Sequence, residues 1–144
     1  MPGQPDKSLG IVIVDHGSRL EQSNQMLEEL AGQFARRFAH QYAVVEPAHM
    51  ELAEPSIATA FDKCMERGAR RVIICPFFLG PGKHWTHDIP RLAADAAMNH
   101  PGVQFHVAAT LGIDDLMLDL LDKRIGQCFE AEPNQFTGAP HNRK

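Results

Sequence analysis

The chain has 144 residues, of which 44% are hydrophobic, and its formal net charge is −4. This length suits one ordinary domain with its own core and is too short for two of normal size. The negative charge argues against a nucleic-acid partner, because domains that bind DNA or RNA are typically basic. No apolar run approaches the roughly 20 residues that cross a bilayer, and residues 1–7 lack the apolar segment of a secretory signal. We therefore expect a cytoplasmic protein without a membrane partner.

The cysteines exclude two further classes of protein. Cys64, Cys75 and Cys128 are odd in number and far apart in the sequence. This spacing indicates neither a disulfide framework nor a paired-cysteine metal site. We expect reduced thiols, with Cys64 and Cys75 in the core.

Strand patterns recur along the chain. Residues 9–14 form a continuous apolar run rich in β-branched side chains, which is typical of a strand covered on both faces. Shorter patterns at residues 42–46, 72–75 and 103–108 predict three more strands.

Helix patterns separate these strands. Apolar side chains at helical spacing predict an amphipathic helix within residues 27–38. Pro55 is suited to the first turn of a second helix, which Gly68 can end. Pro90 is expected to open a third helix, and residues 113–125 carry the apolar face of a last one.

The alternation predicts an α/β fold, an open sheet of about four parallel strands with helices on both faces and right-handed crossovers. We expect one domain over residues 9–127. Residues 1–8 and 130–144 are expected to form flexible tails, the latter because it holds prolines and little apolar material.

Histidines gather in the loops that follow the predicted strands. His16 follows the first strand, His49 and Glu51 follow the second, and His84 and His87 follow the third. Ligands of open α/β sheets bind at the carboxyl ends of the strands, so these loops are expected to share one cleft. Neutral imidazole is both a metal ligand and a base near neutral pH. The pattern therefore predicts metal or proton chemistry.

Three sequence blocks carry a family resemblance. They are VDHGSR at residues 14–19, ELAEPS at residues 51–56, and PFFLGPGKH at residues 76–84 leading into DIP at residues 88–90. This pattern resembles the small single-domain sirohydrochlorin chelatases, the CbiX and SirB type of class II metallochelatases. The resemblance covers roughly residues 9–125 in the expected order.

The resemblance implies an activity and a pair of site residues. Such chelatases insert iron, cobalt or sometimes nickel into a tetrapyrrole without ATP, so Co²⁺, Fe²⁺ or Ni²⁺ is the expected metal substrate and no nucleotide is expected. His16 and His84 map onto the metal-binding, catalytic pair. Three further residues could be additional metal contacts or have structural roles. The structural alternatives are a half-buried strand residue for His49, a solvated turn charge for Glu51 and a helix-capping residue for His87.

Two imidazoles suit metal insertion chemically. The reaction requires a loosely held ion, loss of its water, and removal of two protons from pyrrole nitrogens. A pair of histidines leaves most coordination positions open, whereas a closed four-ligand site would hold the metal too firmly to transfer it. General base assistance is typically worth about 10²–10⁴-fold in rate.

The tetrapyrrole substrate, with its many carboxylates and flat apolar face, suggests further contacts in the same loops. Basic groups can meet carboxylates through charge-assisted hydrogen bonds, and aromatic rings can meet the flat face, although the phenylalanines could equally be core residues. The substrate-binding candidates are Ser18, Arg19, Lys83 and Trp85, with Arg91, Phe77 and Phe78 as further possibilities.

The resemblance also implies a homodimer, because short forms like this one look like half of the longer two-domain chelatases. The apolar loop at residues 76–79 and the helix surface beginning at Trp85 are the expected wall or interface.

Two other functions compete with this interpretation. A metal carrier or buffer without catalysis would explain the histidines but not the aromatic residues of the loop. A histidine phosphatase would need an arginine before its nucleophile, whereas Asp15 precedes His16 and would repel a phosphoryl group.

Overall fold

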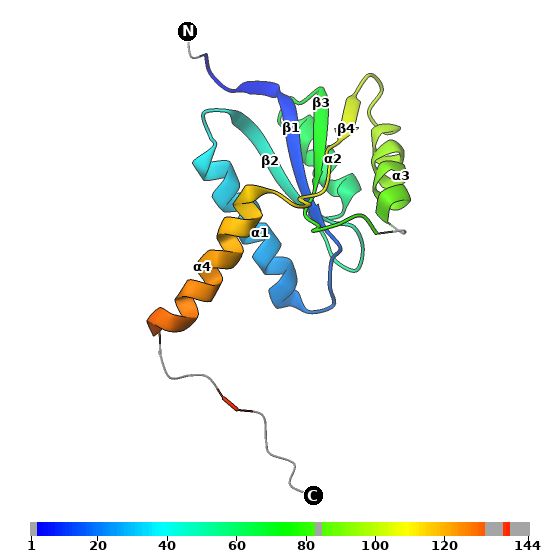
Figure 1. Ribbon diagram of the computed structural model, residues 1–144. Coiled ribbons are helices and arrows are strands. Elements are labelled where there is room, and N and C mark those ends of the chain that lie inside the picture. The colour runs from blue at the N-terminus through cyan, green and yellow to red at the C-terminus, as the bar shows by residue number, and fades with distance from the viewer. Residues whose placement is uncertain (1–2, 83–84, 132–136, 139–144) are drawn as a thin grey trace, which may run out of the picture. The chain divides into compact units, whose positions relative to one another are not determined.

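The structure, a computed structural model, describes residues 3–82, 85–131 and 137–138. The chain divides into two compact units, Met1–Gly112 and Ile113–Lys144. Strands and helices alternate through the described residues (Figure 1). In chain order the elements are β1 (Asp6–Asp15), α1 (Glu21–Arg37), β2 (Tyr42–His49), α2 (Ile57–Glu66), β3 (Arg71–Pro76), α3 (Trp85–Ala97), β4 (Gln104–Val107) and α4 (Asp115–Ala131).

The first unit is built on a four-stranded sheet with the order β2-β1-β3-β4. Every neighbouring pair is parallel: β1 pairs with β2 and β3, and β3 pairs with β4. The predicted open α/β sheet of four parallel strands is confirmed. Because β1 lies between two partners, the loop that follows it is flanked by the loops that follow β2 and β3.

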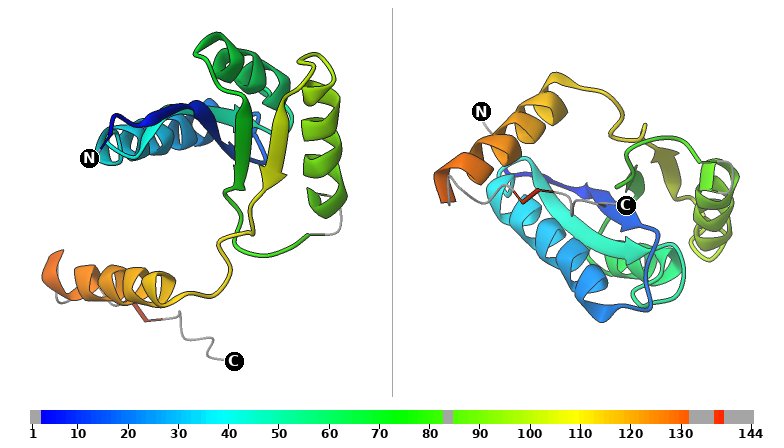
Figure 2. Two further views of the ribbon diagram at one scale, coloured as in Figure 1. Left: turned by 90° about the horizontal axis from the view of Figure 1, so that it is seen from above. Right: turned by 60° about the horizontal axis from the view of Figure 1, so that its bottom comes forward.

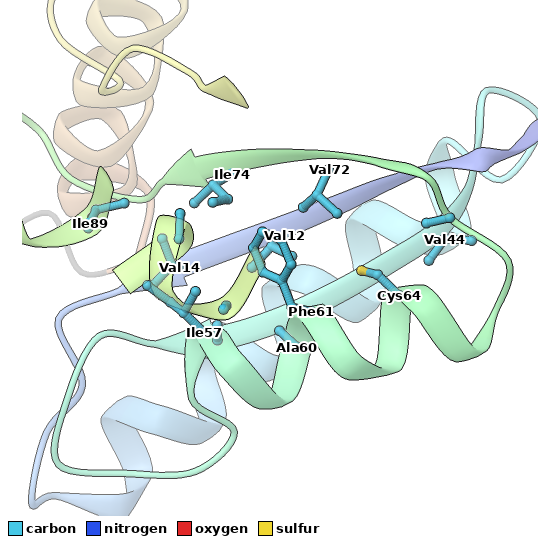
Figure 3. Close-up of a cluster of buried hydrophobic side chains, with 14 of the residues drawn as sticks. Val12, Val14, Val44, Ile57, Ala60, Phe61, Cys64, Val72, Ile74 and Ile89 are labelled. Atoms are coloured by element: carbon cyan, nitrogen blue, oxygen red, sulfur yellow. The ribbon is translucent and has the colours of Figure 1, made fainter. Parts of the chain in front are cut away.

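Helices cover both faces of this sheet, as predicted (Figure 2). Successive side chains of β1 point to opposite faces. Val12 and Val14 belong to a core with Phe61 that α2 and α3 complete (Figure 3). Ile11 and Ile13 belong to a second core that α1 covers.

Two proline-based predictions of helix starts are wrong. Helix α2 begins at Ile57 after Ser56, whose hydroxyl accepts the Thr59 N–H at 3.1 Å, so Pro55 lies before the cap. Helix α3 begins at Trp85 and contains Pro90 within it. Pro90 is tolerated because α3 begins so shortly before it that its missing N–H costs a single hydrogen bond near the amino end.

Several elements are longer than their apolar patterns predict. β1 begins at Asp6 and α1 at Glu21, where polar residues continue the regular backbone. β2 continues from residues 42–46, where its pattern lies, to His49. This extension matters for function because it carries the strand to the sheet edge where β1 ends.

The second unit contains α4, which runs to Ala131, into the predicted tail. Exposed apolar side chains lie along it. None of the helices in the described ranges combines the length and apolarity needed to span a membrane. Among the described residues of this unit, the exposed large apolar ones are Ile113, Leu116, Leu118, Leu120, Leu121, Ile125 and Phe129.

The three thiols differ in burial, which predicts their reactivity. Cys64 is fully buried, and burial raises the pKa of its thiol to about 12, while Cys75 is partly buried and its pKa is also raised. Cys128 is exposed. The thiolate is the reactive form, so we expect a thiol reagent at about pH 8 to label Cys128 and to spare Cys64 until the chain is unfolded. Mass spectrometry after timed alkylation measures this, and rapid labelling of Cys64 in the folded protein would contradict its place in the core.

Candidate functional site

His16 and Glu51 lie side by side at the carboxyl edge of the sheet. The Met50 N–H donates to the Asp15 carbonyl at 2.8 Å, and the Glu51 N–H donates to the His16 carbonyl at 3.1 Å. These bonds continue the β1–β2 ladder beyond the strands. Both the His16 and Glu51 residues are exposed, so an imidazole and a carboxylate are open to solvent from adjoining chain segments.

Gly17 permits this close approach. Its φ is +84°, and a Cβ added there would lie 1.8 Å from the Glu51 carbonyl oxygen. Its N–H donates to Asp15 Oδ1 at 2.9 Å, which closes a tight turn directly after His16. A residue with a side chain cannot occupy this position unless the two segments separate.

The loop after β3 supports His16 from the other side. The Phe77 N–H donates to the Val14 carbonyl at 2.7 Å, which ties this loop to β1. The ring of buried Phe78 contacts the His16 ring edge to face, with 4.6 Å between centroids and 82° between planes. Phe78 is therefore a core residue that supports the imidazole, whereas Phe77, 41% exposed, is accessible to a ligand.

The loop after β4 joins the same edge. The Leu111 N–H donates to the Phe78 carbonyl at 2.9 Å, and the Gly112 N–H donates to the Leu79 carbonyl at 2.7 Å. The loops that follow all four strands are thus connected by backbone hydrogen bonds within the first unit.

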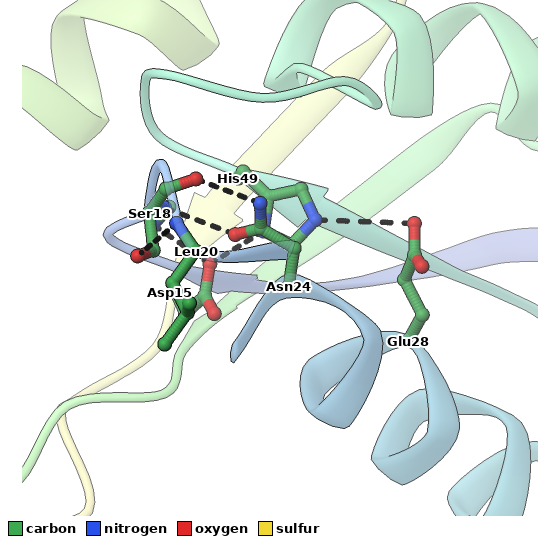
Figure 4. A network of polar contacts seen from close by, with 7 residues as sticks. Asp15, Ser18, Leu20, Asn24, Glu28 and His49 are labelled. Carbon is green, nitrogen blue, oxygen red and sulfur yellow. Dashed lines mark hydrogen bonds and ion pairs between the residues drawn. The ribbon is translucent and has the colours of Figure 1, made fainter. Parts of the chain in front are cut away.

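His49 is a buried residue in a polar network with Asp15 and Glu28 (Figure 4). Its side chain is fully buried, and Nδ1 lies 2.7 Å from Asp15 Oδ1. Nε2 lies 3.9 Å from Glu28 Oε1 and has no hydrogen-bond partner among the described residues. The sequence placed His49 at the correct strand end but left open whether its imidazole faces solvent.

Ser18 and Arg19 differ in their surroundings. The Ser18 N–H donates to Asn24 Oδ1 at 2.9 Å, the Asn24 amide donates to the Ser18 carbonyl at 2.7 Å, and the Ser18 hydroxyl accepts the Leu20 N–H at 2.9 Å. These bonds organise the start of α1. Arg19 is exposed and lines a polar groove of about 310 Å³ that Glu28 also lines. Asn24 was not among the residues predicted from the sequence, because nothing in its local pattern distinguishes it from a solvated helix residue.

The remaining predicted residues lie around α3. Lys83 and His84 lie outside the described residues, as does the side chain of Trp85, the first residue of α3. His87 is exposed in the first turn, and the exposed Arg91 pairs with Asp88 at 3.5 Å.

No set of three His, Cys, Asp or Glu side chains within residues 3–82 and 85–131 is arranged to hold a metal ion. A metal bound beside His16 would thus complete its coordination with water, with substrate or with a group from outside these ranges.

Known proteins resemble this chain in sequence and in fold. The family model described as CbiX matches residues 10–128. The chain belongs to the CbiX family. This CbiX-family chain is 53% identical over 120 residues to "Sirohydrochlorin ferrochelatase, chloroplastic" of Arabidopsis thaliana, covering 83% of the chain and 52% of that relative. It is 43% identical over 90 residues to "Sirohydrochlorin cobaltochelatase" of Methanocaldococcus jannaschii, covering 62% of each.

A solved structure shares the CbiX-family fold. The structure described as SirB from Bacillus subtilis with Fe³⁺ superposes with a TM-score of 0.73 at 29% identity, covering 84% of this chain and 47% of that chain. The chain therefore spans about half the length of the Arabidopsis relative and of this SirB chain, at 52% and 47%.

Proposed function

We propose that this chain is a lyase that inserts a divalent metal, Fe²⁺ or Co²⁺, into sirohydrochlorin. The observation that carries the proposal is the pairing of exposed His16 with exposed Glu51 at the sheet edge of a CbiX-family chain. Of the two relatives described above, one is named a ferrochelatase and the other a cobaltochelatase. Ni²⁺ is a third candidate metal, and no nucleotide takes part.

The proposed mechanism uses His16 as metal ligand and proton acceptor. A neutral imidazole at the open edge holds the ion weakly, and after the ion passes to the macrocycle the freed ring nitrogen can take a proton from a pyrrole nitrogen. His84 supplies the second imidazole. Glu51 supplies a carboxylate, which lowers the cost of bringing a dication to this edge and can serve as a further acceptor. Exposed His87 is a candidate for an additional metal contact.

The proposed substrate contacts come from the same loops. Arg19, which is exposed, is suited to the macrocycle's carboxylates, and Lys83 is proposed for the same role on its charge. Phe77 and Trp85 are suited to its apolar face, and the Phe77 residue is 41% exposed. The Ser18 hydroxyl can still donate to a carboxylate, because its bond with Leu20 uses only its acceptor side.

Absorbance spectroscopy tests the function directly. The purified chain is incubated with sirohydrochlorin and Fe²⁺, Co²⁺ or Ni²⁺ under anaerobic conditions, beside a protein-free control. A chelatase converts many equivalents of macrocycle per protein at a rate proportional to protein concentration. Metal binding without any change in the macrocycle spectrum beyond the protein-free rate would favour a carrier, and phosphate release from a phosphoester would favour a phosphatase.

We also propose that the working unit is a homodimer. A single sheet edge is small beside a flat tetrapyrrole, and the SirB chain is about twice as long as the part this chain matches, with 47% of it covered. Phe77 and Leu79, which are 41% and 65% exposed on either side of buried Phe78, provide apolar surface for pairing. Two-fold dimers are the commonest homo-oligomers.

Sedimentation of the intact chain at micromolar concentration is expected to give a dimer. Replacing both Phe77 and Leu79 by serine removes the apolar loop surface and is expected to shift the equilibrium at least about tenfold toward monomer. Met98→Ser is the matched control, since Met98 is 80% exposed and lies directly after the carboxyl end of α3, away from the loop at residues 76–79 in the sequence. A monomer with full specific activity on dilution, or equal dissociation in both variants, would contradict the proposed dimer.

A further inference from the structure

The chain keeps a histidine where an apolar residue would cost less. His49 is fully buried, yet its Nε2 atom has no hydrogen-bond partner among the described residues. A buried polar atom without a partner costs roughly 1–3 kcal/mol, and such atoms are rare in folded proteins. A phenylalanine or leucine at the same place would avoid this cost. The other ring nitrogen must therefore contribute something that an apolar side chain could not.

That contribution is a hydrogen bond to Asp15. The Asp15 carboxylate can only accept, so the His49 Nδ1–H is the donor in the 2.7 Å contact with Oδ1. The same oxygen accepts the Gly17 N–H at 2.9 Å. One carboxylate oxygen thus joins a buried anchor in β2 to the turn that directly follows His16. The bond to His49 limits rotation of the Asp15 side chain. The bond to Gly17 then restrains the backbone directly after His16, and so limits the directions that the His16 imidazole can take.

We propose that His49 and Asp15 are positioning residues that fix the direction of the His16 imidazole. The inference rests on the proposed function only in naming metal as the ligand that His16 meets. It assigns His49 a place behind the site rather than in the metal's coordination sphere. The burial of the whole His49 side chain supports this role. Its Nε2 atom also lies 3.9 Å from Glu28 Oε1 of α1, so this nitrogen is directed toward the helix.

Three substitutions of His49 distinguish the effect of the hydrogen-bond donor's position from the effect of side-chain volume. In His49→Asn the amide nitrogen can occupy the place of Nδ1 and donate to Asp15. In His49→Gln the amide reaches the place of Nε2 instead, and in His49→Phe the volume is kept but no donor remains. We expect metal insertion and Co²⁺ affinity to fall about 10- to 100-fold in the Phe and Gln variants, as is typical when a residue that orients a metal ligand is lost. His49→Asn is expected to recover at least about half of that loss on a logarithmic scale.

Spectroscopy distinguishes a positioning residue from a ligand. If His49 acts behind the site, the visible band of bound Co²⁺ keeps its shape in His49→Asn while the affinity changes. If His49 is itself a ligand, the band shifts because the donor set has changed. A shifted band, or an Asn variant as impaired as the Phe variant, would overturn the proposal.

A metal-free measurement keeps the test valid in any variant that folds. The His16 ring lies against Phe78, so ring-current effects displace its imidazole proton resonances. We expect these resonances to move or broaden in His49→Phe and to stay near their wild-type positions in His49→Asn. Unchanged His16 resonances in all three variants would refute the positioning role. Absence of wild-type insertion together with the expected resonance changes would refute the proposed function alone.

The link through Asp15 gives a separate check. In Asp15→Ala the acceptor shared by His49 and Gly17 is gone, so adding His49→Phe is expected to change Co²⁺ affinity and His16 resonances little further. Residues that act as one unit show such non-additivity. Thermal melting of each variant shows whether the chain has folded. Independent, additive losses in the double variant would show that His49 does not act through Asp15.

Discussion

His16→Ala is expected to lower metal insertion into sirohydrochlorin by about 10²-fold or more while leaving the fold intact. The imidazole is exposed at the sheet edge and serves in the proposed mechanism both as ligand and as proton acceptor, and loss of a general base alone costs about 10²–10⁴-fold. Its only described ring contact is with Phe78, so its removal takes little from the core. Initial rates from the macrocycle spectrum, with circular dichroism to verify folding, provide the measurement.

The same experiment extends to His84. If the two histidines share one metal, the single variants are expected to be similarly impaired and the double variant little worse than either. His40→Ala, which replaces an exposed histidine in the turn after α1, is the matched control and is expected to retain normal rates. Strictly multiplicative losses, or near-normal turnover in His84→Ala, would count against a shared site.

Gly17→Ala is expected to be as damaging as loss of His16, for a different reason. The added Cβ would lie 1.8 Å from the Glu51 carbonyl oxygen. This oxygen belongs to the backbone, so a change of side-chain rotamer cannot relieve the clash. The segments after β1 and β2 must then separate, with loss of the Glu51 N–H bond to the His16 carbonyl. We expect a free energy of unfolding lower by at least about 2 kcal/mol, measured by urea denaturation, and a rate of insertion lower by about 10²-fold.

Gly102→Ala distinguishes the cost of a positive φ from the cost of the clash with Glu51. Gly102 also has a positive φ, +89°, but an added Cβ there would meet nothing within 4 Å. This variant is expected to pay only the conformational cost of about 1 kcal/mol and to keep its activity. Equal effects at both glycines would mean that φ strain alone, and not the approach of Glu51, explains the damage.

The sheet could be predicted because its central strand β1 is a continuous apolar run and its helices are amphipathic. Those patterns arise from burial, which acts over whole elements and therefore leaves a period in the sequence. Element ends were less predictable, since they depend on single local interactions. Pro90 resembles a helix start, yet α3 begins at Trp85, where the Thr86 N–H and hydroxyl both bond the Gly82 carbonyl.

For the site, too, the positions set by the sheet could be predicted, whereas those set by single local contacts could not. His16 and Glu51 could be placed at one sheet edge because strand ends determine which loops meet. The burial of His49 could not be predicted, because the sequence of β2 does not reveal whether a histidine at its end faces solvent or a carboxylate from the neighbouring strand. Only the distance between His49 Nδ1 and Asp15 Oδ1, 2.7 Å across two strands, distinguishes a buried anchor from an exposed ligand.

The central place of β1 in the sheet also has a consequence for how the chain folds. β1 is synthesised first, but both of its neighbours, β2 and β3, come from residues 42–76. No hairpin can form between parallel strands, so each pairing must wait for a crossover of many residues, and such non-local contacts slow folding. Until then, the apolar residues 11–14 lack the neighbouring strands β2 and β3 with which they pair. We therefore expect refolding in milliseconds to seconds rather than microseconds, and a nascent chain that depends on chaperones or low temperature to stay unaggregated until β3 emerges.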